Sequence, residues 1–447
     1  MQADPKAVTR WSLEHALPRQ LVRVARRRGD LQARLFFAAE KHETADLVEI
    51  FREAQEKGPL VPSRLGYLTA DHAVVREVLG SPDVRTGFPL TADSPVGRAL
   101  TWAKFGYLHP LRPPSLLATE PPDHTRYRKL VTRVFSVKAV DALRPRIQGI
   151  ADRLLDDLAA RPGVVDLAED YCAKLPVIVI SEILGVPAEE HDYVLQLGTG
   201  AAPSLDFGLS WRAAQHVEQS LRDFDAWLDH HIERLRREPG DDLMSKLIAA
   251  RDEQGGLNEV ELKSTAGLVL AAGFETTVNL IGNTIALFSD HPDQLALAQA
   301  DPGLWPNVVD EALRIDPPVL LTGRSTTRQS TIAGQPVREN ALITAVLAAA
   351  NRDPKVFDDP DRFDVTRANA KDHLSFSSGR HFCLGAALAR MEAEIGLRSL
   401  YDRFPDLRLQ PGRRRRTTRV LRGFEHLPAR LGADHAAHLL SRSTPRP

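Results

Sequence analysis

A cysteine in a short, glycine-bounded loop is the feature that most constrains this 447-residue chain. Cys383 lies between Gly379 and Gly385, and an alanine-rich run, residues 386–392, follows at once. This run has the composition of a helix, so the loop presents one thiol at a helix start. Backbone N–H groups and the positive end of the helix dipole favour the thiolate form at such a position.

The chemistry open to this thiolate is limited by the number of cysteines. The chain has only two, and Cys172 lies in an apolar segment that is typical of a buried residue. An isolated thiolate cannot complete a zinc or iron–sulfur site, because these need several ligands. It can be the axial ligand of a haem iron, where a thiolate donates electron density that favours O–O cleavage. The flanking glycines make a plain core residue a poorer interpretation of Cys383.

Composition is that of an ordinary globular protein. The chain is 43% hydrophobic and 26% charged, and its net charge of −1 gives no general attraction to nucleic acid or anionic lipid. Two cysteines exclude a disulfide framework and fit a reducing cytoplasm. No stretch reaches about 18 consecutive apolar residues, so no transmembrane segment is predicted.

The N-terminal segment is basic and lacks the apolar centre of a signal peptide. Its apolar residues have near-helical spacing: Trp11, Leu13, Leu17, Leu21 and Val24. Such a helix usually packs on its own domain, although a weak peripheral contact with a membrane surface is an alternative.

The rest of the pattern predicts a mainly α protein with small β-sheets. Residues 140–158 and 215–237 have helical spacing, and strands are expected near residues 60–80 and 315–350. The longest predicted helix starts after Asn258, with Glu261 completing a capping box, and ends near Asp290. We divide the chain into a basic segment at 1–40, a single domain at 41–432 and a loose tail at 433–447.

The middle of the long helix changes abruptly from apolar to polar residues. Ala272 and Gly273 are small, and a glycine within a helix costs about 1 kcal/mol relative to alanine, so a packing or functional reason is expected. Small residues would let a flat cofactor lie against the helix and leave room for O2. Glu275 followed by Thr276 could relay protons to bound oxygen.

Two further sets of charged residues are candidates for a site. Glu311 and Arg314 share a helix face, although such a pair on a surface contributes little. Haem carries two carboxylates and therefore needs cationic donors, for which arginine is well suited. The candidates are His124 and Arg128, four residues apart, with Arg324 and His381; each one alone would more often be a solvated surface charge.

The segment from Phe376 to Gly385 resembles the haem signature of the cytochrome P450 superfamily, and the resemblance extends from about Gly58 to about Leu431. Ser377 stands where many bacterial members have glycine. The resemblance implies the P450 fold, a triangular-prism helical domain in which haem b lies between the long distal helix and the proximal cysteine helix. It also implies a soluble, cytoplasmic haem-thiolate monooxygenase whose catalytic domain is residues 41–432.

The resemblance assigns roles to individual positions. Cys383 would be the axial iron ligand, and Glu275 and Thr276 would deliver protons. The other cofactor-binding residues would be His124, Arg128, Arg324, His381, Phe376, Gly379, Gly385, Ala272 and Gly273. A structural triad would be formed by Glu311, Arg314 and Arg362. The substrate pocket would include Phe88, Leu90, Leu205, Phe207, Leu268, Ala272, Val319, Leu320 and Phe424.

The function expected from these assignments is insertion of one atom of O2 into an apolar small molecule by a monomeric enzyme. Because the chain shows no flavin or iron–sulfur domain, electrons would come from a separate ferredoxin and its NAD(P)H-dependent reductase. An acidic ferredoxin would dock on basic residues of the thiolate side, namely Lys129, Arg133, Lys138 and Arg380, and the Arg413–Arg416 run would either extend this face or form a solvated loop. No nucleic-acid partner is expected.

Three alternatives stay open at this point. A peroxide-driven peroxygenase would not need the Glu275–Thr276 pair. A haem-binding sensor or carrier would have no turnover, and a nitric oxide reductase would take electrons directly from NADH. Lipid, steroid, terpenoid and polyketide substrates are all compatible with the sequence.

Overall fold

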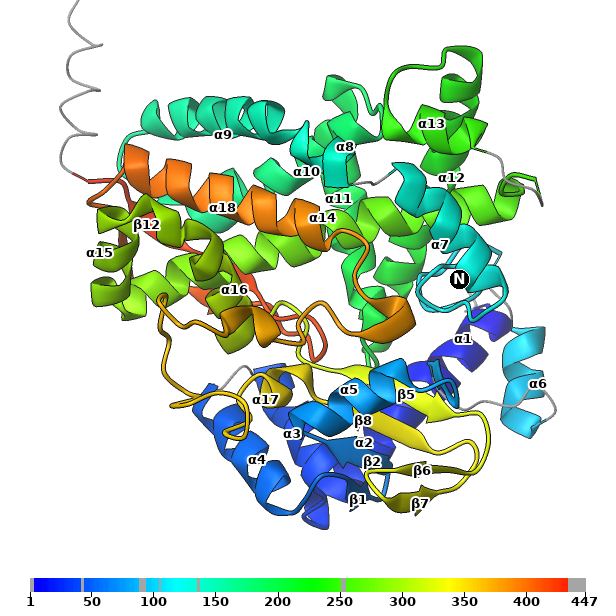
Figure 1. Ribbon diagram of the computed structural model, residues 1–447. Helices are drawn as coiled ribbons and strands as arrows, with labels where there is room; N and C mark the ends of the chain where they lie inside the picture. The colour runs from blue at the N-terminus through cyan, green and yellow to red at the C-terminus, as the bar shows by residue number, and fades with distance from the viewer. Residues whose placement is uncertain are drawn as a thin grey trace, which may run out of the picture.

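The computed structural model describes residues 4–41, 44–87, 94–103, 106–134, 137–250 and 255–432. Helices dominate, as predicted: those from α7 to α16 and α18 gather on one side of the molecule, and a β-sheet with α2 to α5 and α17 forms the other (Figure 1). The helices are α1 (Pro5–Trp11), α2 (Leu17–Arg27), α3 (Leu31–Lys41), α4 (Thr44–Glu56), α5 (His72–Gly80), α6 (Pro95–Trp102), α7 (Asp123–Val134), α8 (Val137–Asp141), α9 (Arg144–Ala159), α10 (Lys174–Ile183), α11 (His191–Ala201), α12 (Trp211–Arg237), α13 (Leu243–Ala249), α14 (Glu259–Asp290), α15 (Pro292–Ala300), α16 (Trp305–Ile315), α17 (Leu347–Ala350) and α18 (Ala386–Arg403).

The main sheet has five short strands in the order β1 (Val61–Ser63), β2 (Gly66–Thr69), β8 (Leu342–Ala345), β5 (Thr322–Thr326) and β3 (Val84–Thr86). β2 and β8 are parallel, and the other neighbours are antiparallel. Both predicted strand regions are therefore confirmed. Smaller sheets join β4 (Val164–Asp166), β12 (Pro428–Arg430) and β9 (Arg408–Leu409), and β10 (Arg414–Arg415) with β11 (Phe424–His426).

Within the second of these regions, the alternating pattern of residues 331–337 favours one strand, but the segment is a hairpin of β6 (Ser330–Ile332) and β7 (Gln335–Val337). Ala333 and Gly334 have φ angles of 52° and 73° and reverse the chain. The alternating pattern predicted extended structure correctly, but it could not show the turn at its centre.

The long helix α14 forms as predicted. The Asn258 side chain accepts from the Glu261 N–H at 3.0 Å, and the Glu261 carboxylate accepts from the Asn258 N–H at 2.9 Å, which completes the capping box. The helix ends at Asp290, directly before His291 and Pro292. In the part of the chain that the structure describes, α14 is the one helix long and apolar enough to cross a membrane, but 65% of its most apolar window is buried inside the protein, as in a core helix.

The N-terminal helices pack on the rest of the protein. Arg10, only 4% exposed, forms an ion pair of 2.9 Å with Glu218 on α12, and the Trp11 indole N–H donates to the Leu209 carbonyl at 3.0 Å. On the next helix, α2, three apolar side chains stay exposed: Leu17, Leu21 and Val24. The division at residue 40 and a membrane contact stay predictions, and the predicted tail at 433–447 lies outside the described residues.

Candidate functional site

Cys383 lies, as predicted, in a tight loop before α18. Its N–H donates to the Phe376 carbonyl at 2.9 Å, which closes the loop. Gly379 has a φ of 67°, and a Cβ there would lie 2.7 Å from the Leu79 carbonyl oxygen, so the close approach to α5 requires glycine. Ser377 has a φ of 65°, a left-handed conformation that costs a residue with a side chain about 1–2 kcal/mol, which explains why glycine suits this position better.

Opposing effects act on the pKa of the Cys383 thiol. Burial raises the pKa of Cys383, whereas the Gly385 N–H and the guanidinium groups of Arg128 and Arg390 lower it. The position at the helix start therefore accounts only for an effect that lowers the pKa of Cys383, and burial opposes it. A metal cation bound to the sulfur would offset the cost of burying the thiolate. The second cysteine, Cys172, is buried in the core, where burial raises its pKa strongly.

Nitrogen donors from three parts of the chain gather near the cysteine loop. The rings of His124, on α7, and His381 lie 4.5 Å apart between centroids. Glu120 accepts from Arg380 at 2.9 Å and contacts His381 at 3.3 Å. Burial raises the pKa of Glu120, but hydrogen bonds from His381 and from the Thr86 N–H outweigh this effect and hold it at about 2.

This cluster has more donors than acceptors. Arg324, on β5, is 6% exposed, and burial lowers its pKa to about 10. The Nε2 atom of His124 is buried and has no hydrogen-bond partner among the described residues, and burial lowers the pKa of this imidazole to about 4. Glu120 is the one carboxylate that the described residues pair with the cluster. The arrangement is therefore suited to a bound carboxylate.

Arg128 lies differently from what was expected. Its Nη2 donates to the Phe382 carbonyl at 2.7 Å, so it supports the cysteine loop itself. Its contact with a haem carboxylate stays a prediction.

The middle of α14 has one accessible stripe. Leu268, Ala272 and Thr276 follow one another at intervals of four residues and are partly or fully exposed, whereas Leu270 and Val278 are at most 3% exposed. The Thr276 hydroxyl donates to the Ala272 carbonyl at 2.9 Å. An accessible stripe inside a core helix indicates open space beside it.

The expectation that Gly273 leaves room for a flat cofactor stays a prediction, because Gly273 is partly exposed but also packs closely against another helix. A Cβ on Gly273 would lie 3.3 Å from the Ile180 side chain on α10, so this glycine permits close packing of two helices. Ala272, its neighbour, lies on the accessible stripe instead. The sequence places both small residues together, but only the helix rotation decides which one faces the open space.

Glu275 lies on a buried side of α14 and is 4% exposed. Its carboxylate pairs with Arg416 at 3.4 Å. Burial raises the pKa of Glu275, and Arg416 opposes this shift.

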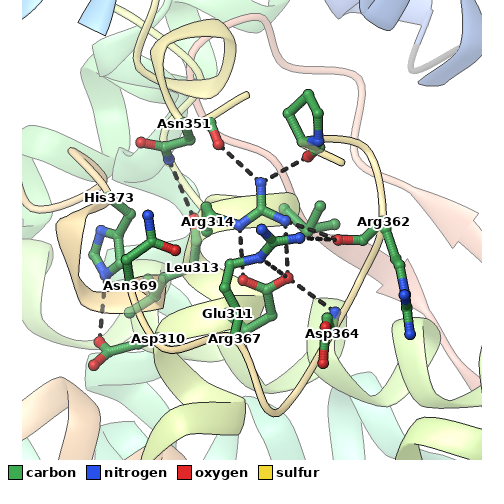
Figure 2. Close-up of polar contacts among 12 residues, drawn as sticks. Asp310, Glu311, Leu313, Arg314, Asn351, Arg362, Asp364, Arg367, Asn369 and His373 are labelled. Carbon is green, nitrogen blue, oxygen red and sulfur yellow. Dashed lines mark hydrogen bonds and ion pairs between the residues drawn. The ribbon is translucent and has the colours of Figure 1, made fainter. Parts of the chain in front are cut away.

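The predicted charged triad is correct in two members and wrong in the third. Arg314 binds Glu311 through two hydrogen bonds, of 2.7 and 2.8 Å, and both side chains are fully buried. The third member is Arg367, whose Nε donates to Glu311 at 3.2 Å, and not Arg362. The Arg362 side chain is exposed and directed away from the cluster, and only its carbonyl accepts from Arg314, at 2.9 Å (Figure 2). Both arginines fit the sequence pattern, and only the path of the loop decides between them.

The predicted pocket residues divide into three groups. Phe88 and Leu90 lie outside the described residues. Leu205, Leu268 and Val319 are partly exposed and Ala272 is exposed. The others pack in the hydrophobic core: Phe207 against the Phe36 ring at 4.8 Å, Leu320 and Phe424. The roles of all these residues in substrate binding stay predictions.

The basic residues of the thiolate side are also only partly as expected. Lys129, Arg133 and Lys138 are exposed on α7 and α8, and beside them Phe382 is 42% exposed. Arg380 instead pairs with Glu120 and donates to the Ser81 carbonyl.

The run from Arg413 to Arg416 is only partly the solvated loop expected, because Arg413 and Arg414 are exposed but Arg414 and Arg415 form β10 and Arg415 and Arg416 are largely buried. Its extension of the basic face stays a prediction. Each arginine pairs with a carboxylate, namely Asp290, Glu425, Asp316 and Glu275 in turn. Sequence reasoning missed Glu120, Arg367, Arg390 and the pairing of Arg416 with Glu275, because the partners of all four residues are remote in sequence. The one local signal is that Glu120 lies four residues before His124.

Comparisons with known proteins agree with this geometry. The family model described as "Cytochrome P450" matches residues 304–424. Cytochrome P450 140 of Mycobacterium tuberculosis is 50% identical over 94% of this chain and 97% of its own length. The 6-deoxyerythronolide B hydroxylase of Saccharopolyspora erythraea is 42% identical over 70% of this chain and 77% of its own length. Among solved structures, P450BioI in complex with an acyl carrier protein has a TM-score of 0.79 at 29% identity, over 86% of this chain and 98% of that chain.

The chain therefore belongs to the cytochrome P450 family. It is a P450 monooxygenase, an oxidoreductase of a family that uses O2, small-molecule substrates and redox partner proteins. Members carry haem b, whose iron a cysteine thiolate holds. The residues described above fit this group: a partly accessible thiol at a helix start, an accessible stripe on α14, and a donor cluster with a buried, unpaired imidazole nitrogen.

Proposed function

We propose that this cytochrome P450 inserts one atom of O2 into a bulky, mostly apolar small molecule. The supporting observation is that the partly exposed residue Cys383 lies in the loop directly before α18, and that α18 packs against α14, the helix that carries the accessible stripe. When bound, haem b supplies the oxygen-activating chemistry, with Cys383 as its thiolate ligand.

Each residue near this site has a proposed task. Arg324, His124 and His381 bind the haem carboxylates, because charge-assisted hydrogen bonds are the strongest available to a buried cluster. Arg128 holds the cysteine loop through the Phe382 carbonyl. The Thr276 hydroxyl lies on the accessible stripe and holds a proton next to O2, and Glu275 supplies that proton from the buried side of α14.

Relatives narrow the substrate class only coarsely. Their names and titles include a 6-deoxyerythronolide B hydroxylase, a vitamin D(3) 25-hydroxylase and a P450 bound to erythromycin B. These support a large, largely apolar ring compound. Titration of such compounds into the haem-loaded protein, followed by the change in haem spin state, would identify binders, and the absence of any shift across the set would reject this class.

Thr276→Ala is expected to retain haem but to divert electrons to hydrogen peroxide, with product per NAD(P)H falling at least about tenfold. The reason is the loss of the hydroxyl that positions the proton. Thr277→Ala is the matched control, because Thr277 is 2% exposed and its hydroxyl donates to the Gly273 carbonyl at 3.0 Å in the same way. Peroxide and product are measured in parallel, and full coupling in Thr276→Ala would reject the assigned role.

We further propose that electrons come from an acidic ferredoxin, itself reduced by an NAD(P)H-dependent reductase, which docks at Lys129, Arg133 and Lys138 around the exposed Phe382. The support is the charge of these exposed side chains beside the cysteine loop.

The double substitution Lys129→Glu and Arg133→Glu is expected to slow haem reduction by an acidic [2Fe–2S] ferredoxin about 10- to 100-fold at low salt, because attraction becomes repulsion. The difference should shrink as ionic strength rises. Stopped-flow reduction rates provide the measurement. The matched control, Arg23→Glu with Arg27→Glu on α2, makes the same change in charge elsewhere and should leave the rate nearly unchanged. Equal rates for both double variants would contradict the docking face.

A further inference from the structure

The hairpin that contains β10 and β11 lies along α14 through its arginines. Arg413 pairs with Asp290 at 2.9 Å, near the end of the helix. Arg415 donates to the Asn283 side chain at 3.2 Å, and Arg416 reaches Glu275 at 3.4 Å. Arg413, Arg415 and Arg416 thus contact α14 progressively closer to its middle. Arg416 contacts Glu275, the acid proposed to deliver protons.

A small cluster of polar side chains surrounds this last contact. Glu275 and Asn279 lie one helical turn apart and share a face of α14. The Arg416 N–H donates to the Gly423 carbonyl at 3.1 Å, so both hairpin residues lie opposite this face. A Cβ on Gly423 would be 1.8 Å from the Asn279 side-chain oxygen, which shows how closely the amide approaches the hairpin backbone.

Among the described residues, three polar atoms of this cluster lack a hydrogen bond of good geometry, although the Asn279 side chain lies close enough to the Glu275 carboxylate to lower its pKa. They are both polar atoms of the Asn279 side chain and the Nε of Arg416, and all three are buried. Leaving such a group unpaired is unfavourable, because it loses its hydrogen bonds to water without replacing them. A group of unpaired donors and acceptors is the setting in which proteins bind ordered water.

The side chains of this cluster extend from the interior toward the surface. Asn279 is 1% exposed and the Glu275 side chain 5% exposed, whereas the Arg416 side chain is 23% exposed. Arg416 is therefore the member of the group that contacts bulk solvent. Among the described residues it is also the charged group that faces Glu275.

We propose that Arg416 is a positioning residue that holds the Glu275 carboxylate at the inner end of a hydrated path, along which protons enter from solvent. A proton from bulk water would pass along water bound by Arg416 and Asn279 to the Glu275 carboxylate. The resulting carboxylic acid would release it toward Thr276, which restores the carboxylate. This inference deepens the proposed function and rests on the assignment of Glu275 to proton delivery.

The test compares Arg416→Gln with Arg416→Lys, which keeps the charge, and with Arg414→Gln. The last is the matched control, because Arg414 belongs to the same run but pairs with Glu425 where both side chains are largely exposed, at 60% and 52%. In haem-loaded protein, the carboxylic acid infrared band that disappears in Glu275→Gln is titrated with pH. Loss of the arginine charge favours the protonated acid, so its midpoint should shift to higher pH in Arg416→Gln. The midpoint should stay in place in Arg414→Gln and return toward the original in Arg416→Lys.

An unchanged midpoint in Arg416→Gln, or an equal shift in Arg414→Gln, would overturn the inference. If Arg416→Gln does not fold, Arg416→His serves the same purpose, because histidine is mostly neutral above pH about 6.5. Peroxide release is measured in parallel. An Arg416→Gln protein that shifts the titration without raising peroxide release would also overturn the inference. Unchanged coupling in Glu275→Gln would instead reject the proposed proton delivery, so the two failures are distinguishable.

Discussion

Replacement of Cys383 by alanine is expected to abolish the strongly red-shifted Soret band that thiolate-ligated haem gives after reduction and treatment with carbon monoxide. The reason is that Cys383 is the proposed thiolate ligand, and a thiolate donates electron density to a haem iron. Oxygen insertion should be lost with it. Haem content is measured on the same samples, since the donor cluster around His124 and Arg324 can retain haem without the iron ligand.

Cys172→Ala is the matched control for this prediction. Cys172 is 1% exposed and packs in the main core, so its loss should lower stability by about 1 kcal/mol and leave the spectrum unchanged. A red-shifted band that persists in Cys383→Ala would show that another group holds the iron. Unsubstituted protein that binds no haem would contradict the whole proposal.

Arg314→Ala is expected to lower the free energy of unfolding by about 3–5 kcal/mol, because it leaves the Glu311 carboxylate buried without its main partner. The substitution also removes the donor to three backbone carbonyls, at Asn351, Pro360 and Arg362. Since these carbonyls belong to the loops before the cysteine segment, loss of haem should accompany the loss of stability. Urea unfolding, followed by circular dichroism and haem absorbance, provides both measurements.

Substitutions of two neighbouring arginines, Arg362 and Arg367, test whether contact with Glu311 causes the loss of stability. Arg362→Ala should change stability by no more than about 0.5 kcal/mol, because its side chain is exposed and its carbonyl remains. Arg367→Ala should cost clearly more, because its side chain is 9% exposed and binds Glu311. Equal costs for Arg362→Ala and Arg367→Ala would contradict the arrangement in Figure 2.

Features set by local sequence were predictable. The capping box at Asn258 and the end of α14 before Pro292 depend on residues a few positions apart, so their pattern was readable. The cysteine loop was also predictable, because its glycines and the following helix are adjacent in sequence. The fold class followed from such local patterns and from the resemblance of one contiguous motif.

Features set by packing were not predictable. The choice of Arg367 over Arg362 depends on the path of a loop, and the different roles of Ala272 and Gly273 depend on the rotation of a helix. The partners of the Arg413–Arg416 run lie on α14, on β11 and after α16, and no local pattern indicates them. Contacts of this kind are fixed only when distant segments meet.

The pairing of all four arginines in that run also determines how the molecule attracts charged partners from a distance. Each positive charge has a carboxylate within 3.4 Å, which weakens its field at a distance, although Asp316 is shared with Arg422. A count of basic residues along the sequence would place a centre of positive potential here. The long-range field that steers an acidic protein depends more on exposed cations such as Lys129 and Lys138, so four consecutive arginines add less to the speed of encounter than their number suggests.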